Sequence, residues 1–538
     1  MKERILLSVM LAFACQMSAF SQNNFQKEFD EFRKETLKEY DDFRKQCLQE
    51  YIDFLRQPWP KKQAKEAVKT PKEKPVPPVV YTEPDTLPDY SKLKKLNGKE
   101  IGVTKPELKP KDKIDKKPIE MPVIQIDDSV SLDIKDGGRA LSLGGGVLRL
   151  KKEVYMQPVP LAPIKEDITL STPEYTFDVF GTECEVRIGD DCRFKLNGVS
   201  SNAVADALQK MMAPQFDNLL HDCLKIREER KLSDWGYYSM LCSLVDNFYG
   251  KDTNEATLAL AFLYMQSGYK MRLGEDGTHL YMLMSSKHSI IGKSYFPIDG
   301  ENYFILRGPD AKRMSICQAK FPKEMSLSLV IPTQQDFDTD AADERIITSR
   351  RYPDFSFGVR LNKNLINFYD TYPASTLNND FMTRWAMYAN APMDKEVTKK
   401  LYPQMKAKLK GMSNLEAMER LLNWVQTGFT YEYDDKVWGG DRAFFGEETL
   451  FYPYCDCEDR SILLSHLVRE LLGLDTVLIY YPGHLAMAVD LAEACDGDYV
   501  QLDGRRFTVC DPTYIGARVG KTMPNMNNAQ AKLILLEK

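Results

Sequence analysis

The sequence lacks an excess of basic residues and lacks long apolar runs. Its 72 lysines and arginines are outnumbered by 78 aspartates and glutamates, which gives a net charge of −6. A chain of this charge has no basic surface for a nucleic-acid backbone, so we expect no nucleic-acid partner. Beyond Ser21 no apolar run is long enough to cross a membrane as a helix, and mean hydropathy is −0.41. We therefore expect no transmembrane span once the N-terminal segment has been removed.

Histidine is scarce, and cysteine is irregularly spaced. The five histidines are residues 221, 279, 288, 466 and 484. Cys455-x-Cys457 has no partner of the Cys-x-x-Cys or His-x3–5-His kind, which disfavours zinc. We predict no metal centre and no cofactor. The eleven cysteines form no disulfide framework. The one local pairing that the sequence indicates joins Cys184 and Cys192 across the turn Gly189–Asp191.

The N-terminus has the pattern of a secretory signal peptide. Lys2 and Arg4 precede an apolar core at Ile5–Ala14, and Ala19-Phe-Ser21 offers small residues before a cleavage point at Gln22. We expect residues 1–21 to be removed and the protein to be secreted or periplasmic. A lipoprotein anchor at Cys15 is the less favoured alternative, because Phe13 fits poorly in such a motif.

Residues 22–57 carry an eleven-residue repeat. Phe29, Tyr40 and Tyr51 recur at one position, and Phe32, Phe43 and Phe54 recur three residues later. Eleven residues over three turns align these aromatic side chains on one helix. The stripe is either a docking or self-association surface for a partner, or a face that packs on the protein itself.

Composition divides the rest of the chain, which is long enough for about three domains. Residues 58–120 hold 11 of the 29 prolines and 16 lysines, so we expect an extended linker that acts as a tether. Alternation predicts β-rich segments at 121–197 and 311–395. Helical periodicity dominates 198–310 and returns near Leu415–Gln426, inside a C-terminal domain at 396–538. The expected fold class is α+β.

The C-terminal domain contains three residues that suit nucleophilic catalysis. Cys457 precedes a helical apolar run that stops at Gly473, so it should lie in the first turn of a helix, where the macrodipole favours a thiolate. His484 begins one expected strand and Asp511 ends another. A thiolate, a base and a carboxylate that orients the base form a catalytic triad. His466 lies nine residues along the helix, too far for proton transfer, and we expect it to pack.

This pattern resembles the transglutaminase-like superfamily, which has papain-like chemistry. The resemblance covers Asn414–Tyr514 and includes Cys457-x-Asp459, the Gly473-Leu stop, the His484 strand and Asp511-Pro-Thr. Asp456-Cys-Glu-Asp459 is also similar to bacterial transglutaminase-like cysteine peptidases, in which carboxylates beside the cysteine can hold calcium. The resemblance implies Cys457 as nucleophile, His484 as base, Asp511 as orienting residue, and a protein or peptide substrate. An oxyanion side chain should come from the Tyr431–Tyr454 loop, with Trp438 as a candidate.

An earlier segment looks like a degenerate copy of the catalytic one. Gly277-Thr-His279-Leu matches Gly483-His484-Leu, and Tyr295–Tyr303 matches Tyr499–Phe507. In this register Asp252, His279 and Arg307 stand where the triad stands later. We therefore predict a degenerate transglutaminase-like domain at 198–310. Two unrelated units of similar order are the alternative.

Two functions follow. The first is a secreted thiol enzyme, a peptidase, amidase or acyltransferase acting on amide bonds. The second is a non-catalytic surface or periplasmic scaffold that uses the same folds for binding. The acidic neighbours of Cys457 favour the second, because they oppose a thiolate.

Overall fold

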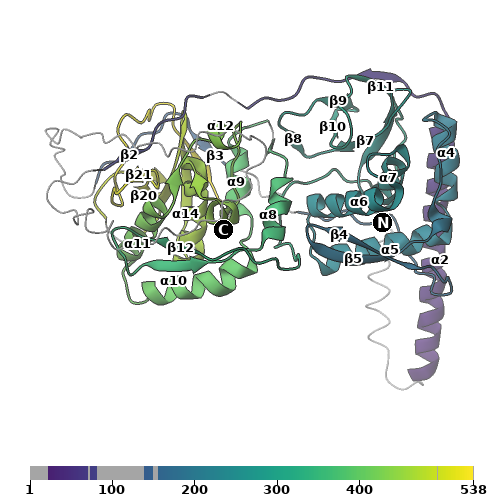
Figure 1. The fold of residues 1–538 in the computed structure, drawn as a ribbon, viewed down its shortest axis with the longest axis horizontal. Coiled ribbons are helices and arrows are strands. Elements are labelled where there is room, and N and C mark those ends of the chain that lie inside the picture. The colour runs from purple at the N-terminus through teal and green to yellow at the C-terminus, as the bar shows by residue number, and fades with distance from the viewer. Residues whose placement is uncertain are drawn as a thin grey trace.

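The computed structural model describes residues 22–70, 73–81, 138–149, 155–377, 379–492 and 495–536. It contains both helices and strands, as expected for an α+β protein, and these form two lobes side by side (Figure 1). The N-terminal segment 1–21, with Cys15, lies outside the described residues. Within the described residues, no helix is long and apolar enough to cross a membrane.

The first lobe packs helices against a six-stranded sheet. Its helices are α4 (Ser201–Lys210), α5 (Pro214–Glu229), α6 (Asp234–Tyr249) and α7 (Asn254–Gln266). Helix α7 is apolar on all sides and buried from Ala256 to Gln266, so it forms the centre of the lobe. The strands lie in the order β1 (Lys61–Gln63), β11 (Arg313–Ile316), β6 (Met271–Glu275), β7 (Leu280–Ser285), β10 (Glu301–Ile305) and β9 (Tyr295–Ile298).

The second lobe is built around helix α14 (Cys457–Leu472) and another six-stranded sheet. The strand order is β19 (Tyr499–Leu502), β20 (Arg505–Cys510), β18 (His484–Val489), β17 (Thr476–Tyr481), β22 (Lys532–Leu535) and β3 (Val147–Leu148). Shorter helical segments surround it: α8 (Lys363–Asp370), α9 (Thr383–Asn390), the π-helical turn Val397–Leu401 with α10 (Tyr402–Leu409), α11 (Asn414–Gly428), α12 (Asp434–Val437) and α13 (Gly446–Phe451).

Short pairs of strands complete the two lobes. The hairpin of β4 (Glu174–Val179) and β5 (Thr182–Arg187) packs on α5 and α6. The remaining pairs are β8 (His288–Ile290) with β14 (Ser375–Leu377), β12 (Arg345–Thr348) with β13 (Ser356–Val359), β15 (Thr430–Tyr431) with β16 (Tyr454–Cys455), and β2 (Val79–Val80) with β21 (Tyr514–Ile515). The last two pairs are parallel.

The two large sheets share one order of strands. In each, a buried helix leads into two antiparallel strands, β6–β7 in one lobe and β17–β18 in the other. A following hairpin then adds its second strand beside them, as β10 beside β7 and β20 beside β18. A later strand, β11 or β22, pairs antiparallel on the opposite side. The outermost strands differ, because β1 is antiparallel to β11 whereas β3 is parallel to β22.

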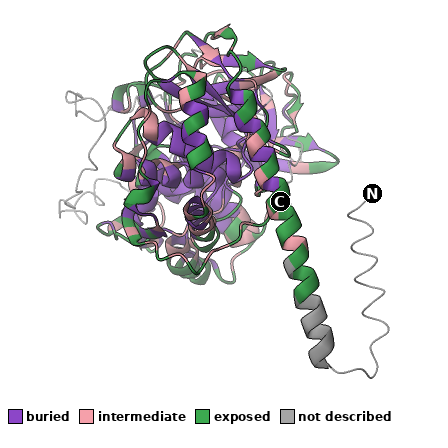
Figure 2. Ribbon diagram, turned by 90° about the vertical axis from the view of Figure 1, so that its right-hand side faces the viewer, coloured by how far each residue is buried: buried purple, intermediate pink, exposed green. Residues whose placement is uncertain are grey.

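Helix α2 (Gln22–Leu55) packs on the first lobe with its C-terminal part only. Leu48, Ile52 and Leu55 are buried, and Arg56 forms an ion pair with Asp206 of α4. The preceding turns extend beyond the body of the protein (Figure 2). The packing interpretation of the aromatic repeat therefore holds for Tyr51, which is 4% exposed, whereas Phe43 is 49% exposed and the docking interpretation stays a prediction.

The first part of the expected linker 58–120 is extended but pairs with both lobes. Residues 59–70 and 73–81, which we name the strap, run from the first lobe to the second (Figure 1). The strap contributes β1 to the first sheet, and β2 pairs with β21 of the second lobe. A segment that cannot build its own core can still satisfy its backbone groups at the edge of an existing sheet. Residues 82–120 lie outside the described residues.

Three further sequence predictions need correction. The 121–197 segment is not one unit, because β3 joins the second sheet while β4 and β5 join the first lobe. The 311–395 segment includes helices α8 and α9, and its first strand, β11, belongs to the first sheet. Cys184 and Cys192 are both free and buried. They form no disulfide because β5 pairs with the preceding strand β4, and Cys192 ends a separate turn at Asp190–Cys192.

Candidate active site

Cys457 is the first residue of helix α14, as predicted. The helix begins there because Asp456 is its N-cap, and the carboxylate of Asp459 accepts the backbone N–H of Asp456 at 3.1 Å. It ends at Gly473, whose φ of +67° is the left-handed conformation that glycine adopts readily. Almost every residue of the first three turns is buried, so the apolar run that predicts the helix also fixes it in the core.

His484 and Asp511 come together because β18 and β20 are antiparallel neighbours. His484 begins β18, and Asp511 directly follows the end of β20. His484 Nε2 lies 2.8 Å from Asp511 Oδ2. The other carboxylate oxygen, Oδ1, accepts the backbone N–H of Thr513 at 2.8 Å. Asp511 is therefore held on both oxygens and fixes the orientation of the imidazole.

Two buried side chains hold the turn that carries Asp511. The amide nitrogen of Gln426 donates to the carbonyl oxygens of Asp511 and Tyr514 at 3.1 and 2.7 Å. Arg460, on α14 and 1% exposed, donates to the carbonyls of Gln426 and Phe429 at 3.2 and 3.0 Å. These contacts join the helix of Cys457 to the turn of Asp511, although no sequence pattern indicated a role for either side chain.

Cys457 and His484 line the same cavity, of about 710 Å³. The second ring nitrogen of His484, Nδ1, is buried and has no partner among the described residues. The backbone N–H of Leu485, the next residue, interacts with the Cys457 sulfur. The histidine thus has one nitrogen bound to a carboxylate and one without a partner, in a residue that lines the same cavity as Cys457, whose thiol is bonded to Glu458.

The charge around Cys457 opposes ionisation of its thiol. Burial, together with the neighbouring carboxylates of Glu458 and Asp456, raises the pKa of Cys457 well above its usual value. The thiol donates to Glu458 Oε2 at 3.3 Å. Burial also raises the pKa of Asp456 and Asp459. Neighbouring carboxylates raise both pKa values further, because they disfavour another negative charge. The acidic setting that the sequence indicated is therefore present and buried.

Arg384, on α9, supplies a cation at this cluster. Its guanidinium forms an ion pair with Asp441 and lies 3.5 Å from Glu458. Ring contacts with Phe381 and Trp385 hold the guanidinium, at 4.0 and 5.0 Å from the ring centroids. Arg384 lies far from Cys457 in the sequence, in a segment expected to be β-rich, so no sequence pattern indicated its place.

The carboxylates also form sets that suit a hard cation. Asp434, Asp441 and Glu458 form one group with ligand atoms within 4.8 Å of one another, and Asp434, Asp456 and Asp459 form another. The Oδ1 atom of Asp456 is buried and has no hydrogen-bond partner among the described residues. Oxygen-only groups of this kind suit Ca²⁺ or Mg²⁺ rather than zinc. A bound cation would supply positive charge beside Cys457.

The strap and the first lobe complete the rim of the cavity. Lys69, Thr70, Glu73 and Pro75 of the strap line it, together with Ile291 and Gly292 of the first lobe. Glu73 accepts the hydroxyl of Tyr480 and, at 2.8 Å, the N–H of Gly483. Val76 donates to the carbonyl of Gly483 at 2.9 Å. The strap is therefore bonded to the residue immediately before His484.

Other residues singled out in the sequence have different places. The ring of Trp438 packs on Tyr452 and Phe444, with Arg442 at 4.3 Å, and it does not line the cavity. Its expected oxyanion role is therefore wrong, because these contacts hold the indole elsewhere. From the same loop, Tyr433 does line the cavity. His466 is buried and bonded to the carbonyl of Tyr388, and burial lowers its pKa to about 3, as fits a packing role.

The positions of the first lobe that the expected register aligns with Cys457, His484 and Asp511 do not combine a thiol with a base. Asp252 and Arg307 face one another at 3.7 Å, and Arg307 also forms an ion pair with Asp246. The His279 side chain is 48% exposed and lies 3.3 Å from Asp276. The first and last of the residues that the expected register aligns with the C-terminal three thus lie together as an ion pair, in which the Arg307 side chain is 12% exposed.

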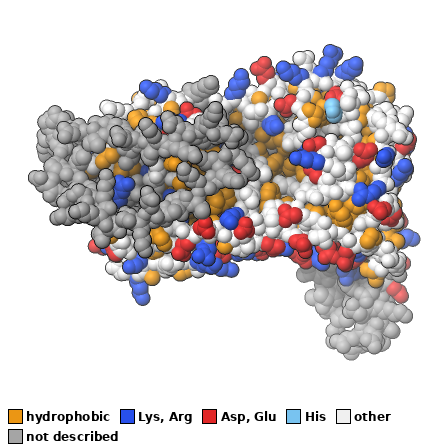
Figure 3. Space-filling model, viewed as in Figure 1, with side chains coloured by type: hydrophobic (Ala, Val, Ile, Leu, Met, Phe, Trp, Pro, Cys, Tyr) orange, Lys and Arg blue, Asp and Glu red, His pale blue; other side chains and the backbone are white. Residues whose placement is uncertain are grey.

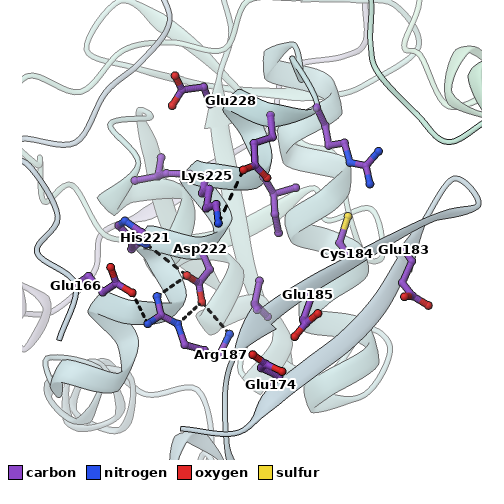
Figure 4. A pocket seen from close by; sticks show the side chains of 15 residues that line it. Glu166, Glu174, Glu183, Cys184, Glu185, Arg187, His221, Asp222, Lys225 and Glu228 are labelled. Atoms are coloured by element: carbon purple, nitrogen blue, oxygen red, sulfur yellow. Dashed lines mark hydrogen bonds and ion pairs between the residues drawn. The ribbon is translucent and has the colours of Figure 1, made fainter. Parts of the chain in front are cut away.

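A larger hollow of about 950 Å³ lies on the first lobe, between α5 and the β4–β5 hairpin (Figure 4). Arg187 lies at its base and is bonded to both Asp222 and Glu166. Burial raises the pKa of Cys184, the one thiol of the lining, to about 11. The thiol of this hollow is neutral, and Glu174, Glu183, Glu185 and Glu228 of its lining form no ion pair among the described residues, so it presents excess acidic charge rather than an activated thiol.

The face of the molecule shown in Figure 3 has no patch of a single charge over its described residues. On the face shown in Figure 3, acidic and basic side chains are interspersed over the described residues. The buried His484–Asp511 pair and the cavity that it shares with Cys457 are therefore the most chemically specific feature of the described part of the molecule. A comparison with known protein families, characterised proteins and solved structures finds nothing that matches this chain.

Proposed function

We propose that this protein is a thiol-dependent enzyme that acts on amide bonds of a protein or peptide. The observation that carries the proposal is His484, bound through Nε2 to Asp511 and with Nδ1 unpartnered in the cavity that Cys457 lines. Only one further contact, from Nδ1 to the thiol, completes the triad. Apo geometry is often looser than the geometry of the complex with substrate.

In the proposed reaction, the Cys457 sulfur attacks the amide carbon while His484 takes the thiol proton. The imidazolium returns that proton to the leaving amine as the C–N bond breaks, which leaves a thioester. Water then hydrolyses the thioester, or a second amine captures the acyl group. Asp511 stabilises the imidazolium, and backbone N–H groups at the start of α14 are suited to the oxyanion.

We further propose that the fold is transglutaminase-like and arose by duplication. The shared strand order of the two sheets and the position of a buried helix in each support this. The first copy would then serve as a wall of the cleft, since Ile291 and Gly292 line the cavity. The signal-peptide pattern supports secretion or a periplasmic location.

The experiment is alkylation of Cys457 by iodoacetamide at neutral pH, read by peptide mass. Cys455, buried in the same segment, is the internal control. We expect Cys457 to react faster in the folded protein than after unfolding in urea, and His484→Ala to slow it at least about tenfold. A Cys457 that reacts no faster than the unfolded thiol would overturn the enzyme proposal.

A scaffold function is the second candidate. The observation that favours it is the buried acidic setting, which keeps the Cys457 thiol protonated. The two candidates differ in a simple assay with casein and a fluorescent primary amine. Cleavage identifies a peptidase, and amine incorporation identifies an acyltransferase. If both are absent while casein still binds, the scaffold is correct.

A further inference from the structure

The exposed face of helix α2 repeats more than aromatic side chains. Phe32, Phe43 and Phe54 are 54%, 49% and 41% exposed. Each follows directly after a carboxylate, at residues 31, 42 and 53, and Phe43 and Phe54 also have a glutamate four residues earlier, at Glu39 and Glu50. Positions four apart lie on one helix face. The repeated unit is therefore an exposed phenylalanine flanked by acids, about 16 Å from the next.

The acids beside this stripe are not neutralised by the helix that carries them. Exposed carboxylates near the stripe are Glu31, Glu35, Glu39, Asp42, Glu50 and Asp53, and among the described residues none of them forms an ion pair. The basic residues of the packed half are engaged elsewhere. Arg44 pairs with Asp217, Lys45 with Asp41, and Arg56 with Asp206.

The two remaining basic side chains of the described helix surface lie off this face. Arg33 lies about 100° from Phe32 on the side opposite the acids, and Lys38 lies about 40° from Asp42, at the outer edge of the acidic flank. The stripe is therefore apolar along its centre and negative along its flank. Figure 2 shows that this part of α2 projects away from the body, so a long partner can lie along it.

We propose that this face of α2 binds a basic amphipathic helix of another protein. Such a helix would offer apolar side chains at the spacing of the phenylalanines and lysine or arginine beside them. A second copy of α2 does not fit, because pairing two such faces brings acids against acids. An anionic membrane surface is repelled for the same reason.

The test uses the purified protein and two synthetic alanine-based helices. Both peptides carry leucine at the eleven-residue spacing. In the first peptide, the residue four positions before each leucine is lysine. In the second peptide, that residue is glutamate. We expect the lysine helix to bind at least about tenfold more tightly by fluorescence anisotropy, and high salt to weaken it. Replacing all three phenylalanines by serine should abolish binding. Arg33→Ala, on the side of the stripe opposite the acids, should leave it unchanged.

Circular dichroism of the serine variant shows whether α2 is still helical, so lost binding is not confused with lost structure. Equal binding of the two helices would overturn the proposal, since charge would then have no role. A dimer in light scattering that the serine variant abolishes would also overturn it, because the face would then bind a second copy. Binding by neither probe would mean that this face does not bind a basic helix.

Discussion

At the scale of single residues, the candidate site holds His484 and Asp511 in a fixed orientation and buries both of these polar side chains. Asp511 accepts hydrogen bonds on both oxygens, so its carboxylate cannot rotate without losing one of them. His484 and Asp511 have side chains 0% and 2% exposed, which keeps water from competing for their contact. The pair is therefore preorganised, and its function depends on one nitrogen remaining free for the thiol.

Asp511→Asn tests this orientation directly. An amide of the same shape can keep the contact to Thr513 N–H, but it no longer enforces the tautomer with the proton on Nε2. We expect the rate of Cys457 alkylation to fall by roughly one to two orders of magnitude, with little change in thermal stability. An unchanged rate would exclude Asp511 as the orienting residue.

Glu447 is a buried residue, and the titration of its carboxyl group should make the free energy of unfolding depend on pH. Burial raises its pKa to about 8, from the ordinary 4.5. The folded protein then holds a proton that the unfolded chain has already released, so the free energy of unfolding falls as pH rises towards 8. Between pH 5.5 and 8 the fall is up to roughly 3 kcal/mol. Glu447→Gln should flatten this slope in urea unfolding, and a slope that persists would assign it to other groups.

At the scale of elements, prediction from sequence succeeded where one element contains its own pattern. The apolar run after Cys457 and the glycine that stops it predicted α14 with its observed ends, and the strands expected at His484 and before Asp511 are β18 and β20. The strap was missed because its pairing depends on backbone hydrogen bonds to strands distant in the sequence, β11 and β21. Arg384 and Asp434 were missed for the same reason: only tertiary packing brings them to Cys457.

The strap should control access to the cavity. Glu73→Ala removes the contacts to Tyr480 and Gly483, and Val76→Pro removes the donor to the Gly483 carbonyl. We expect the double variant to be cut faster in the strap by a nonspecific protease and to admit bulky maleimides to Cys457 more quickly.

Glu66→Ala is the matched control, since Glu66 lies exposed on the same strap. Unchanged proteolysis and unchanged labelling in the double variant would show that the strap does not depend on these bonds. Gly483 itself is a poor choice for substitution, because its φ is +79° and an added Cβ would lie 2.2 Å from the carbonyl oxygen of Lys74.

At the scale of the whole molecule, the acidic cluster beside Cys457 joins segments that lie far apart in the chain. Asp434 begins α12, Asp441 lies in the loop between α12 and α13, Glu458 comes from α14, and Arg384 from α9. Repulsion among these carboxylates costs stability, and a divalent cation would relieve it. A cation bound only by the folded state raises the melting temperature by mass action.

We therefore expect Ca²⁺ to raise the melting temperature by roughly 5 °C over EDTA, measured by calorimetry. Asp434→Asn should remove most of this increase, since Asp434 belongs to both carboxylate groups. Asp435→Asn, an exposed neighbour outside these groups, should retain it. An equal melting temperature in Ca²⁺ and in EDTA would mean that bound protons and Arg384 alone balance the negative charge of the carboxylate cluster.

The strap has a mechanical consequence as well. Its β1 is three residues long and β2 is two, so each is held to its partner by only a few backbone hydrogen bonds. Tension applied between α2 and the second lobe would run along this segment and detach β1 before it opened either large sheet. The load would then pass to the bonds of Lys65 with Tyr295 and of Val68 with Gly292, and after them to Glu73 and Val76, which are bonded to Gly483 beside His484. A pull on the N-terminal helix would in this way be transmitted directly to the candidate base.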